Sequence, residues 1–457
     1  MKKLCKRAIE FVQVMNDDGE VRLCGWLKDG GVIGRLSEKS MKEIYNSKEA
    51  QLIKEKHAAG DYSNCNPNAC PYVANNNVDE NCIEVEEFPE YPPALYLAYE
   101  NVCNYRCVMC TIPDCMAKEK YEEREKKLNK IDEEVIKVLP YVKTLSAHGL
   151  GELFASKHIM KVLSEWKPIA PAEECSVELE TNGSLFNAKN WEKISNLGQY
   201  KLNVFITVLS FKEDVYQELS GTALPISNLI YNLHFVKKLR EEGVINHLTI
   251  ATVYQQKNFR ELPEFARRCI EEFGADYVRL RPFEPWREPD MQDWFKDVRN
   301  EYHPDHAEFV EIMKDPIFKH PKVHDWGGGN VSGLGPEPYP WTRARYRMVE
   351  QVLCDDTFIE RVKSKINTEK IVVYGMHIVG RTLAAHLKDD YKIIYCIDRA
   401  MHGRFYKDIP IYGVNNLENL DRDATVIVSL DRNEDAVISL MKKEGYKNVV
   451  SIKDLVC

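Results

Sequence analysis

The sequence predicts an α/β protein whose centre is a partial (β/α)6 TIM-like barrel, with an N-terminal cysteine-rich module and a small C-terminal doubly wound α/β domain. Six apolar runs alternate with helix-like segments in the middle of the chain, which is the pattern of a parallel sheet. The alternation restarts near residue 370, and nine of the fourteen cysteines lie before residue 116. A chain of 457 residues is also too long for one core. We therefore expect an N-terminal module at 1–90, a barrel at 91–320, an irregular linker at 321–368 and a final domain at 369–457.

The N-terminal module is expected to begin with a β-hairpin. The apolar runs at 8–15 and 20–26 flank Asp17-Asp18-Gly19, a strong hairpin-turn signal. Helices follow, and the spacing of Ser40 and Glu43 fits a capping box. A Pro/Asn-rich loop and a polar linker complete the module.

The barrel strands are the six apolar runs, each followed by a helical pattern except the last. They are ALYLAY (94–99), VKTLSA (142–147), SVELET (176–181), NVFITVLS (203–210), HLTIATVY (247–254) and YVRLRPF (277–283). Six is fewer than the eight of a closed barrel, so the predicted barrel is partial.

The C-terminal domain is expected to pair strands at 370–375, 392–398 and 424–430 with helices at 377–388 and 435–445. Gly375 and Gly380 bracket the first strand-to-helix turn, but His377 stands where a dinucleotide-binding turn has its middle glycine. Asp398 ends the next strand, where a ribose-binding acid would lie. Nucleotide binding and substrate docking both stay open for this domain.

The stretch CNYRCVMC carries the main chemical signal. Cys103, Cys107 and Cys110 are spaced C-x3-C-x2-C directly after the first barrel strand, at the sheet edge where α/β folds place their active sites. A zinc site completed by a further ligand such as Cys115, or simple reactive thiols, would also use cysteines. Three thiolates on a four-iron cluster instead leave one iron open for another ligand.

This stretch resembles the radical S-adenosylmethionine superfamily, and further stretches match it in chain order. The resemblance implies a [4Fe–4S] cluster on Cys103, Cys107 and Cys110 whose open iron chelates S-adenosylmethionine. Met109 replaces a residue that is often aromatic in that family, and its backbone is expected to approach the adenine. By resemblance, the other cofactor-binding residues are Gly149, Gly151 and Glu152 for the methionine amino group, Thr181 and Asn182 near the ribose, and Ser210 for the carboxylate.

A second cysteine set lies in the N-terminal module. Cys5 and Cys24 flank the hairpin, and Cys65 and Cys70 lie in the Pro/Asn-rich loop. The layout resembles the SPASM or twitch module, which implies an auxiliary [4Fe–4S] cluster, although that module usually follows the barrel. A structural zinc site is the alternative, and Cys82 competes with Cys5 for the fourth position.

Composition and net charge limit the expected binding partners and cellular compartment of the protein. A net charge of −9 argues against a large nucleic-acid surface. Glu10 and Gln13 interrupt any signal-peptide apolar segment, and no apolar run reaches the length of a membrane span. We therefore expect a cytoplasmic protein without a membrane partner.

These patterns together predict an enzyme that reductively cleaves S-adenosylmethionine and abstracts hydrogen from a substrate, with oxidation or epimerisation as the outcome. The substrate is expected to be a small carbohydrate or nucleotide-linked molecule, and the electron donor an external flavodoxin or ferredoxin. Cys115 or Cys175 would return a hydrogen atom in an epimerase, and Arg281, which shares a strand face with Arg279, would hold an anionic group. The alternatives are a radical methyltransferase, a peptide-modifying radical enzyme and a zinc-bound scaffold protein without turnover.

Overall fold

The structure is a computed structural model, and it divides the chain into two units. They comprise Met1–Glu284 with Val298–Leu334, and Pro285–Asp297 with Gly335–Cys457. The structure describes residues 2–28, 30–66, 70–74, 77–110, 121–147, 150–284, 296–299, 303–325, 348–398, 403–414, 416–417, 420–430 and 434–456. Within these residues, no helix combines the length and apolar character that crossing a membrane requires.

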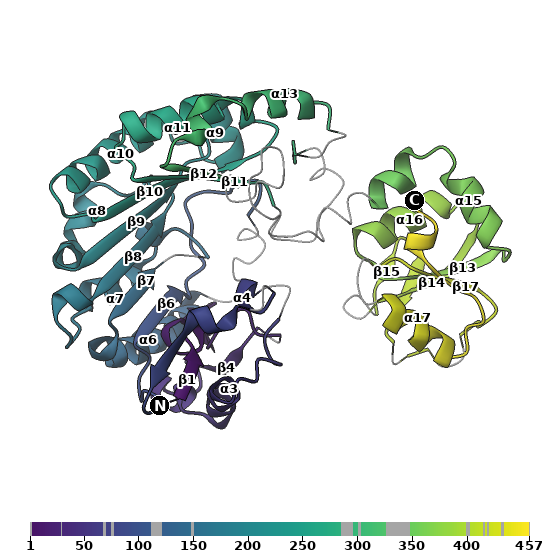
Figure 1. Cartoon of the computed structure of the whole chain (residues 1–457), viewed down its shortest axis with the longest axis horizontal. Helices are drawn as coiled ribbons and strands as arrows, with labels where there is room; N and C mark the ends of the chain where they lie inside the picture. The colour runs from purple at the N-terminus through teal and green to yellow at the C-terminus, as the bar shows by residue number, and fades with distance from the viewer. Residues whose placement is uncertain are drawn as a thin grey trace. The chain divides into compact units, whose positions relative to one another are not determined.

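A ten-stranded sheet forms the centre of the first unit (Figure 1). In spatial order it contains β12 (Val323–Asp325), β11 (Tyr277–Pro282), β10 (His247–Tyr254), β9 (Lys201–Thr207), β8 (Ser176–Thr181), β7 (Thr144–Ala147), β6 (Ala94–Ala98), β2 (Val12–Met15), β3 (Glu20–Arg22) and β4 (Val32–Arg35). Neighbours from β12 to β2 are all parallel, and β3 and β4 are antiparallel additions. The prediction of an α/β fold with a large parallel sheet is confirmed.

Helices cover one face of this sheet, and charged side chains of β8 lie on the other face. They are α6 (Tyr121–Val138), α7 (Lys157–Glu165), α8 (Ala188–Glu192), α9 (Glu213–Ser220), α10 (Ile226–Glu241), α11 (Leu262–Glu271) and α13 (His306–Ile312). Val177 and Leu179 of β8 are buried against the helical layer, whereas Glu178 is exposed and Glu180 is half-buried. Figure 1 shows α8, α10 and α11 along the outer side of the curved sheet. The uncovered face is called the inner face below.

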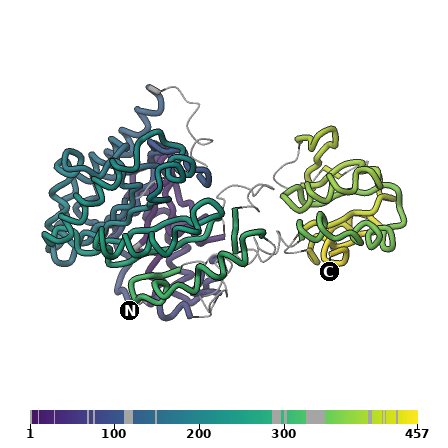
Figure 2. The backbone as a smooth tube through the Cα atoms, turned by 90° about the horizontal axis from the view of Figure 1, so that it is seen from above, coloured from purple at the N-terminus to yellow at the C-terminus, as the bar shows by residue number. Residues whose placement is uncertain are grey.

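The N-terminal segment is part of the same sheet, which crosses the boundary expected near residue 90. β2 pairs in parallel with β6, with Val12 opposite Leu95. The tube in Figure 2 shows this purple segment inside the first unit. The remaining module elements are β1 (Lys2–Cys5), β5 (Cys82–Val85), α1 (Arg7–Glu10), α2 (Met41–Tyr45), α3 (Lys48–Ala58) and α4 (Pro71–Ala74).

Two of the local structures predicted for the module are present, and one is replaced by a helix. The hairpin is confirmed, because β2 and β3 pair across the predicted turn and Gly19 has φ +66°. The capping box is also confirmed, since the Glu43 amide donates to the Ser40 hydroxyl at 3.3 Å and the Ser40 amide to the Glu43 carboxylate at 3.0 Å. The strand expected over 8–15 is wrong in its first half, where α1 buries Ala8 and Ile9 instead.

The linker expected at 321–368 is not irregular throughout. It contains β12, which adds a seventh strand after the six expected, and α15 (Phe358–Lys365). Phe358, Val362 and Ile366 recur every four residues and are all buried in the C-terminal core. This spacing places the three side chains on the face of α15 and its C-terminal end that packs in the core.

The second unit is built on a six-stranded sheet. Its order is β15 (Phe405–Tyr406), β16 (Ile409–Tyr412), β14 (Lys392–Ile397), β13 (Lys370–Tyr374), β17 (Thr425–Val428) and β18 (Val449–Ser451). Ile371 and Val373 pack in the core that contains α15 and α16 (Ile378–Leu387). Val372 and Tyr374 pack in the opposite core, with Met441 of α17 (Glu434–Lys443). Helices therefore cover both faces of this sheet.

Candidate functional site

The three closely spaced cysteines lie together at the carboxyl end of β6. Residues 101–110, called the cysteine loop below, carry all three thiols half-buried. Burial raises the pKa of Cys107 to about 12, and the neighbouring Cys103 and Cys110 thiols add to the effect. The Tyr105 amide also donates to the Cys103 sulfur at 3.4 Å. The loop thus gathers three sulfurs and aims at least one backbone N–H at them, as ligating thiolates require.

Backbone contacts hold the cysteine loop from two sides. The Glu152 amide donates to the Val102 carbonyl at 2.7 Å, and a Cβ on Gly151 would lie 2.3 Å from that same oxygen. On the other side, Arg106 and Val108 donate to the carbonyls of Ser220 and Leu219 at the end of α9, at 2.8 and 3.0 Å. The sequence pointed to Gly151, but the contribution of α9 was missed, because nothing local marks it.

A polar network joins the predicted stretches after β6, β7 and β8. One Glu152 oxygen accepts from the Thr181 hydroxyl at 2.5 Å and the Phe154 amide at 3.2 Å, and the other accepts from the Asn182 amide at 2.7 Å. The Asn182 side chain donates to Asn104 in the cysteine loop at 3.0 Å. Glu152 is only 2% exposed, so its carboxylate holds the loops together instead of facing an open site.

Two further residues in this network escaped the sequence analysis. Asn104 donates to the Ser184 hydroxyl at 2.8 Å, and Ser184 donates to Asn182 at 2.6 Å. Asn104 lies inside CNYRCVMC, and Ser184 directly follows Asn182-Gly183. Their positions next to predicted site residues were the signal from which the sequence could have identified them.

The other predicted cofactor residues are placed differently from one another. Met109 is half-buried in the cysteine loop. Ser210 is 1% exposed and donates to Glu261 at 2.7 Å, which is the arrangement of a strand-end cap. Gly149 and Cys115 lie outside the described residues.

Cys175, a predicted site residue, lies away from the cysteine loop. This residue directly precedes β8, whereas the cysteine loop follows β6, and the intervening strands are parallel. Cys175 therefore lies at the opposite edge of the sheet, buried to 1% exposure. It cannot return a hydrogen atom to a substrate above the cysteine loop.

The inner face carries charges of both signs. Arg279 and Arg281 of β11 point to this face, and the guanidinium of Arg279 lies 5.6 Å from the centroid of the Phe205 ring. Burial lowers the pKa of Arg279, as does Arg281, while Glu180 and Glu178 act in the opposite direction. The predicted candidate Arg281 thus lies on a polar surface that spans β8 to β11.

The second cysteine set is also brought together. Cys5, Cys24, Cys65 and Cys70 are buried, and this group is called the auxiliary site below. Burial raises the pKa of Cys65 to about 12, and the thiols of Cys70, Cys5 and Cys24 add to it in that order. An isolated bridge pairs Leu27 with Cys65 and so joins the hairpin end to the Pro/Asn-rich loop.

Cys82 lies next to this site but has other contacts. It pairs with Cys5 across β1 and β5, and its thiol donates to the Val78 carbonyl at 3.2 Å. Cys5 is buried, as are Cys24, Cys65 and Cys70, whereas Cys82 is half-buried. Burial therefore groups Cys5, and not Cys82, with the other three cysteines.

Both cysteine sets fit a cluster better than a single ion. Among the described residues, no group of three or more His, Cys, Asp or Glu side chains is gathered for one metal ion. In a four-iron cluster each thiolate binds a different iron, so the sulfurs stand farther apart than around one ion. At the auxiliary site, N–H groups of Arg7 and Asn81 donate to the Cys5 sulfur, which is the outer-shell pattern of a ligated thiolate.

The glycine turn of the C-terminal unit is closed by its own side chains. The Met376 amide donates to Asp398 at 2.6 Å, and the His377 ring accepts from the Val379 amide at 3.2 Å. A Cβ on Gly380 would lie 1.8 Å from the Gly375 carbonyl oxygen. Asp398 thus supports the turn, and nucleotide binding there stays a prediction.

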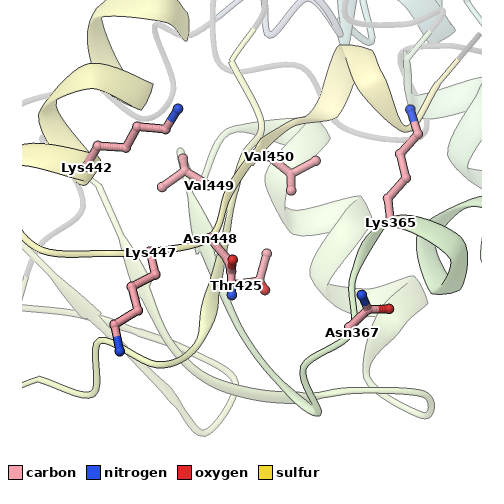
Figure 3. Close-up of a pocket in the computed structure, with 8 residues that line it drawn as sticks. All are labelled: Lys365, Asn367, Thr425, Lys442, Lys447, Asn448, Val449 and Val450. Carbon is pink, nitrogen blue, oxygen red and sulfur yellow. The ribbon is translucent and has the colours of Figure 1, made fainter.

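A pocket of about 260 Å³ in the same unit is lined by Lys365, Asn367, Thr425, Lys442, Lys447, Asn448, Val449 and Val450 (Figure 3). In Figure 3 the Lys447 side chain extends in the opposite direction to those of Lys365 and Lys442. Lys365 donates to the Asp454 carbonyl, and Lys447 pairs with Asp423 at 3.3 Å. The lysines therefore do not converge on an anion.

A buried ionisable cluster lies beneath the cysteine loop. The His158 ring is 2.8 Å from the Asp132 carboxylate, which also accepts from the Tyr99 hydroxyl at 2.7 Å. Burial opposes the charge on His158, but the hydrogen bond and charge of Asp132, with Glu100 and Glu125, outweigh it and raise the pKa of His158. Tyr99 and Glu100 lead directly into the loop, so this cluster supports its base.

The raised pKa of His158 predicts a pH-dependent local stability. A histidine whose folded pKa exceeds its unfolded value of about 6.5 adds stability that is full below that pH and is lost as pH rises through the folded pKa. We expect amide protection in α7 to fall across this interval in the wild type. His158→Gln, which stays neutral, should show the same protection factors at both ends. Hydrogen exchange at pH 6 and 8 measures this, and equal pH dependence in both proteins would contradict the role of His158.

Comparison with known proteins identifies the N-terminal module. Residues 5–71 match the family model of SPASM, described as an iron–sulfur cluster-binding domain. A search of curated proteins finds no match. The matched range contains all four cysteines of the auxiliary site.

Several solved structures are similar at low identity. SuiB from Streptococcus suis is 15% identical, with 63% of this chain and 57% of that chain covered and a TM-score of 0.34. The radical S-adenosylmethionine methyltransferase TsrM from Kitasatospora setae, with cobalamin and a [4Fe–4S] cluster bound, is 17% identical over 40% and 36% of the two chains, with a TM-score of 0.29. Methylornithine synthase (PylB) is 12% identical over 53% and 74%, with a TM-score of 0.32.

The chain spans less than two thirds of the first two structures, and similarities of this size assign no activity. The SPASM match is independent of them and bears on the cofactor directly. It confirms the predicted iron–sulfur module: residues 5–71 of this chain match the SPASM family of iron–sulfur cluster-binding domains.

Proposed function

We propose that the protein is a radical S-adenosylmethionine enzyme with a catalytic [4Fe–4S] cluster on Cys103, Cys107 and Cys110 and an auxiliary [4Fe–4S] cluster on Cys5, Cys24, Cys65 and Cys70. The observation that carries the proposal is the cysteine loop: three gathered thiols at the carboxyl end of a parallel strand, fixed by the Gly151 turn. Three thiolates would leave one iron open, and a cluster with S-adenosylmethionine bound there would supply a 5′-deoxyadenosyl radical.

The chain's own residues would position this chemistry. Asn104 and Asn182 link the cysteine loop to the loop after β8, and Glu152 fixes both from behind. Asn182 is half-buried, so it retains an exposed part for a cofactor beside the loop. Because these hydrogen bonds tie the loops to one another, a cofactor bound there would keep one orientation toward the inner face.

The inner face supports a polar substrate with an anionic group. Arg279 and Arg281 would bind a phosphate or carboxylate, and Glu178 and Glu180 would accept from hydroxyl or amino groups. A nucleotide-linked or otherwise charged carbohydrate has this combination. Oxidation or epimerisation of it, driven by a flavodoxin or ferredoxin, is the finer form of the proposal.

Iron analysis of cysteine variants tests the two-cluster arrangement. Anaerobically purified wild type should contain about eight irons and about eight sulfides per chain, since each cluster holds four. The variant Cys103→Ala/Cys107→Ala/Cys110→Ala and the variant Cys24→Ala/Cys65→Ala should each lose about half. Cys175→Ala, at the opposite sheet edge, is the control and should lose none. Zinc in place of iron would overturn the proposal in favour of a scaffold protein.

Product analysis tests the reaction class with the same variants. Dithionite and S-adenosylmethionine should yield 5′-deoxyadenosine with wild type and Cys175→Ala, and none with the variant that lacks Cys103, Cys107 and Cys110. With deuterated nucleotide-sugar and peptide probes, deuterium in 5′-deoxyadenosine identifies the substrate class. S-adenosylhomocysteine as the main product would instead indicate a methyltransferase.

A further inference from the structure

Arg7 lies directly against the auxiliary site, in a position that the SPASM match does not explain. It follows Cys5 by two residues, and its backbone N–H donates to the Cys5 sulfur. Its guanidinium carbon lies 3.8 Å from the ring centroid of Trp26 and 4.0 Å from that of Phe11. Trp26 follows Cys24 by two residues, so a cation is clamped between two rings beside two expected cluster ligands.

Among the side chains that the structure describes, no acidic one pairs with this half-buried cation. Within the described part of the chain, Arg7 forms no ion pair, and its buried Nε has no hydrogen-bond partner. Withdrawing part of an unpaired guanidinium from water is costly, and two cation–π contacts offset only part of that cost. A [4Fe–4S] cluster with four thiolates carries net negative charge, and it would supply the missing counter-charge.

Phe11, one of the two rings that contact Arg7, also connects it to the inner face. The Phe11 ring lies 5.4 Å from the ring of Tyr96 in β6, whose pKa is raised by burial and by Glu180 and Glu178 of the inner face. A Cβ on Gly25 would lie 2.9 Å from the Gln13 side chain, and Gln13 pairs with Tyr96. The auxiliary site and the inner face are thus neighbours, with Arg7 between them.

We propose that Arg7 is a positioning residue that sets the reduction potential of the auxiliary cluster. One-electron reduction adds a negative charge to the cluster, and a fixed cation nearby stabilises the reduced state. Arg7 therefore raises the potential and makes the cluster a better electron acceptor. This inference rests on the auxiliary cluster of the proposed function.

A redox titration followed by electron paramagnetic resonance tests this. The background is Cys103→Ala/Cys107→Ala/Cys110→Ala, so that only the auxiliary cluster gives a signal. Arg7→Gln should lower the ratio of reduced to oxidised cluster at least tenfold at a given potential, a shift of about 59 mV for one electron. Arg7→Lys, which keeps the charge, should stay close to wild type. Arg35→Gln removes an exposed charge paired with Asp18 in the same module and is the control.

Each outcome of the titration supports or overturns the role of Arg7 in setting the reduction potential. An unchanged potential in an Arg7→Gln protein with full iron overturns the inference. If Arg7→Gln loses iron, Trp26→Leu decides, because it keeps the charge but opens the clamp: a lowered potential supports the role of Arg7 and an unchanged one overturns it. Absence of iron in the background protein itself would overturn the proposed auxiliary cluster, which is a separate failure.

Discussion

Gly151→Ala should abolish iron loading at Cys103, Cys107 and Cys110 and leave the SPASM cluster in place. The added Cβ would lie 2.3 Å from the Val102 carbonyl oxygen, 3.0 Å from the Val102 nitrogen and 3.1 Å from the Glu100 carbonyl oxygen. All three atoms are backbone, so the clash cannot be relieved by a side-chain rotation. The chain leading into Cys103 must move, and a thiolate displaced by about 1 Å no longer fits a preorganised site.

Iron analysis checks this expectation without any substrate. Gly151→Ala should retain about half of the wild-type iron, since one of two four-iron clusters is lost, and should form no 5′-deoxyadenosine. Gly198→Ala is the matched control, because its Cβ would meet only a Val244 methyl group at 3.1 Å and a Trp191 ring atom at 3.8 Å. Full iron in Gly151→Ala would show that the turn does not set the loop position.

Glu152→Gln should release the loop after β8 from the cysteine loop. The two carboxylate oxygens accept three hydrogen bonds, and an amide can offer only one oxygen. Its NH2 group would then face a donor, either the Asn182 amide or the Thr181 hydroxyl and Phe154 amide. Each buried donor left unsatisfied costs about 1–3 kcal/mol, so we expect local destabilisation of this size.

Hydrogen exchange at Asn182 and Gly183 measures that loss directly. Protection should fall in Glu152→Gln, and cofactor turnover should fall with it because Asn182 is no longer held toward Asn104. Glu178→Gln makes the same change on β8 at an exposed position and should leave exchange and iron content unaltered. Normal protection in Glu152→Gln would mean that contacts other than those of Glu152 hold the loop after β8 in place.

The order of the motifs along the chain was enough to predict which loops meet. Asn182 and Glu152 follow successive strands, and parallel strands bring such ends to one edge. The burial of Glu152 could not be predicted in this way, because it depends on donors from the loop after β8 and from its own turn. The exclusion of Cys175 was available in principle, since a residue before a strand lies at the opposite edge.

The pairing of strands that are far apart in the sequence could not be predicted either. The union of β2 with β6 joins residues more than 80 positions apart, and no local pattern announces it. The helical period at Phe358, Val362 and Ile366 was present but lay in a segment rich in prolines and aromatics. Arg7 carries no motif at all, and only its two ring contacts reveal it.

The strand order has a consequence for how the chain is made. From β6 to β12, neighbours in the sheet are consecutive strands of the sequence, and β2, which pairs with β6, is made before all of them. A ribosome therefore releases the hairpin first and then each strand in the order in which it is needed, so the sheet can be extended from one side during translation. The three cysteines emerge immediately after the first strand to dock, but the turn that fixes them is synthesised some forty residues later. Insertion of the proposed catalytic cluster would thus belong to a late stage of maturation, after this part of the sheet exists.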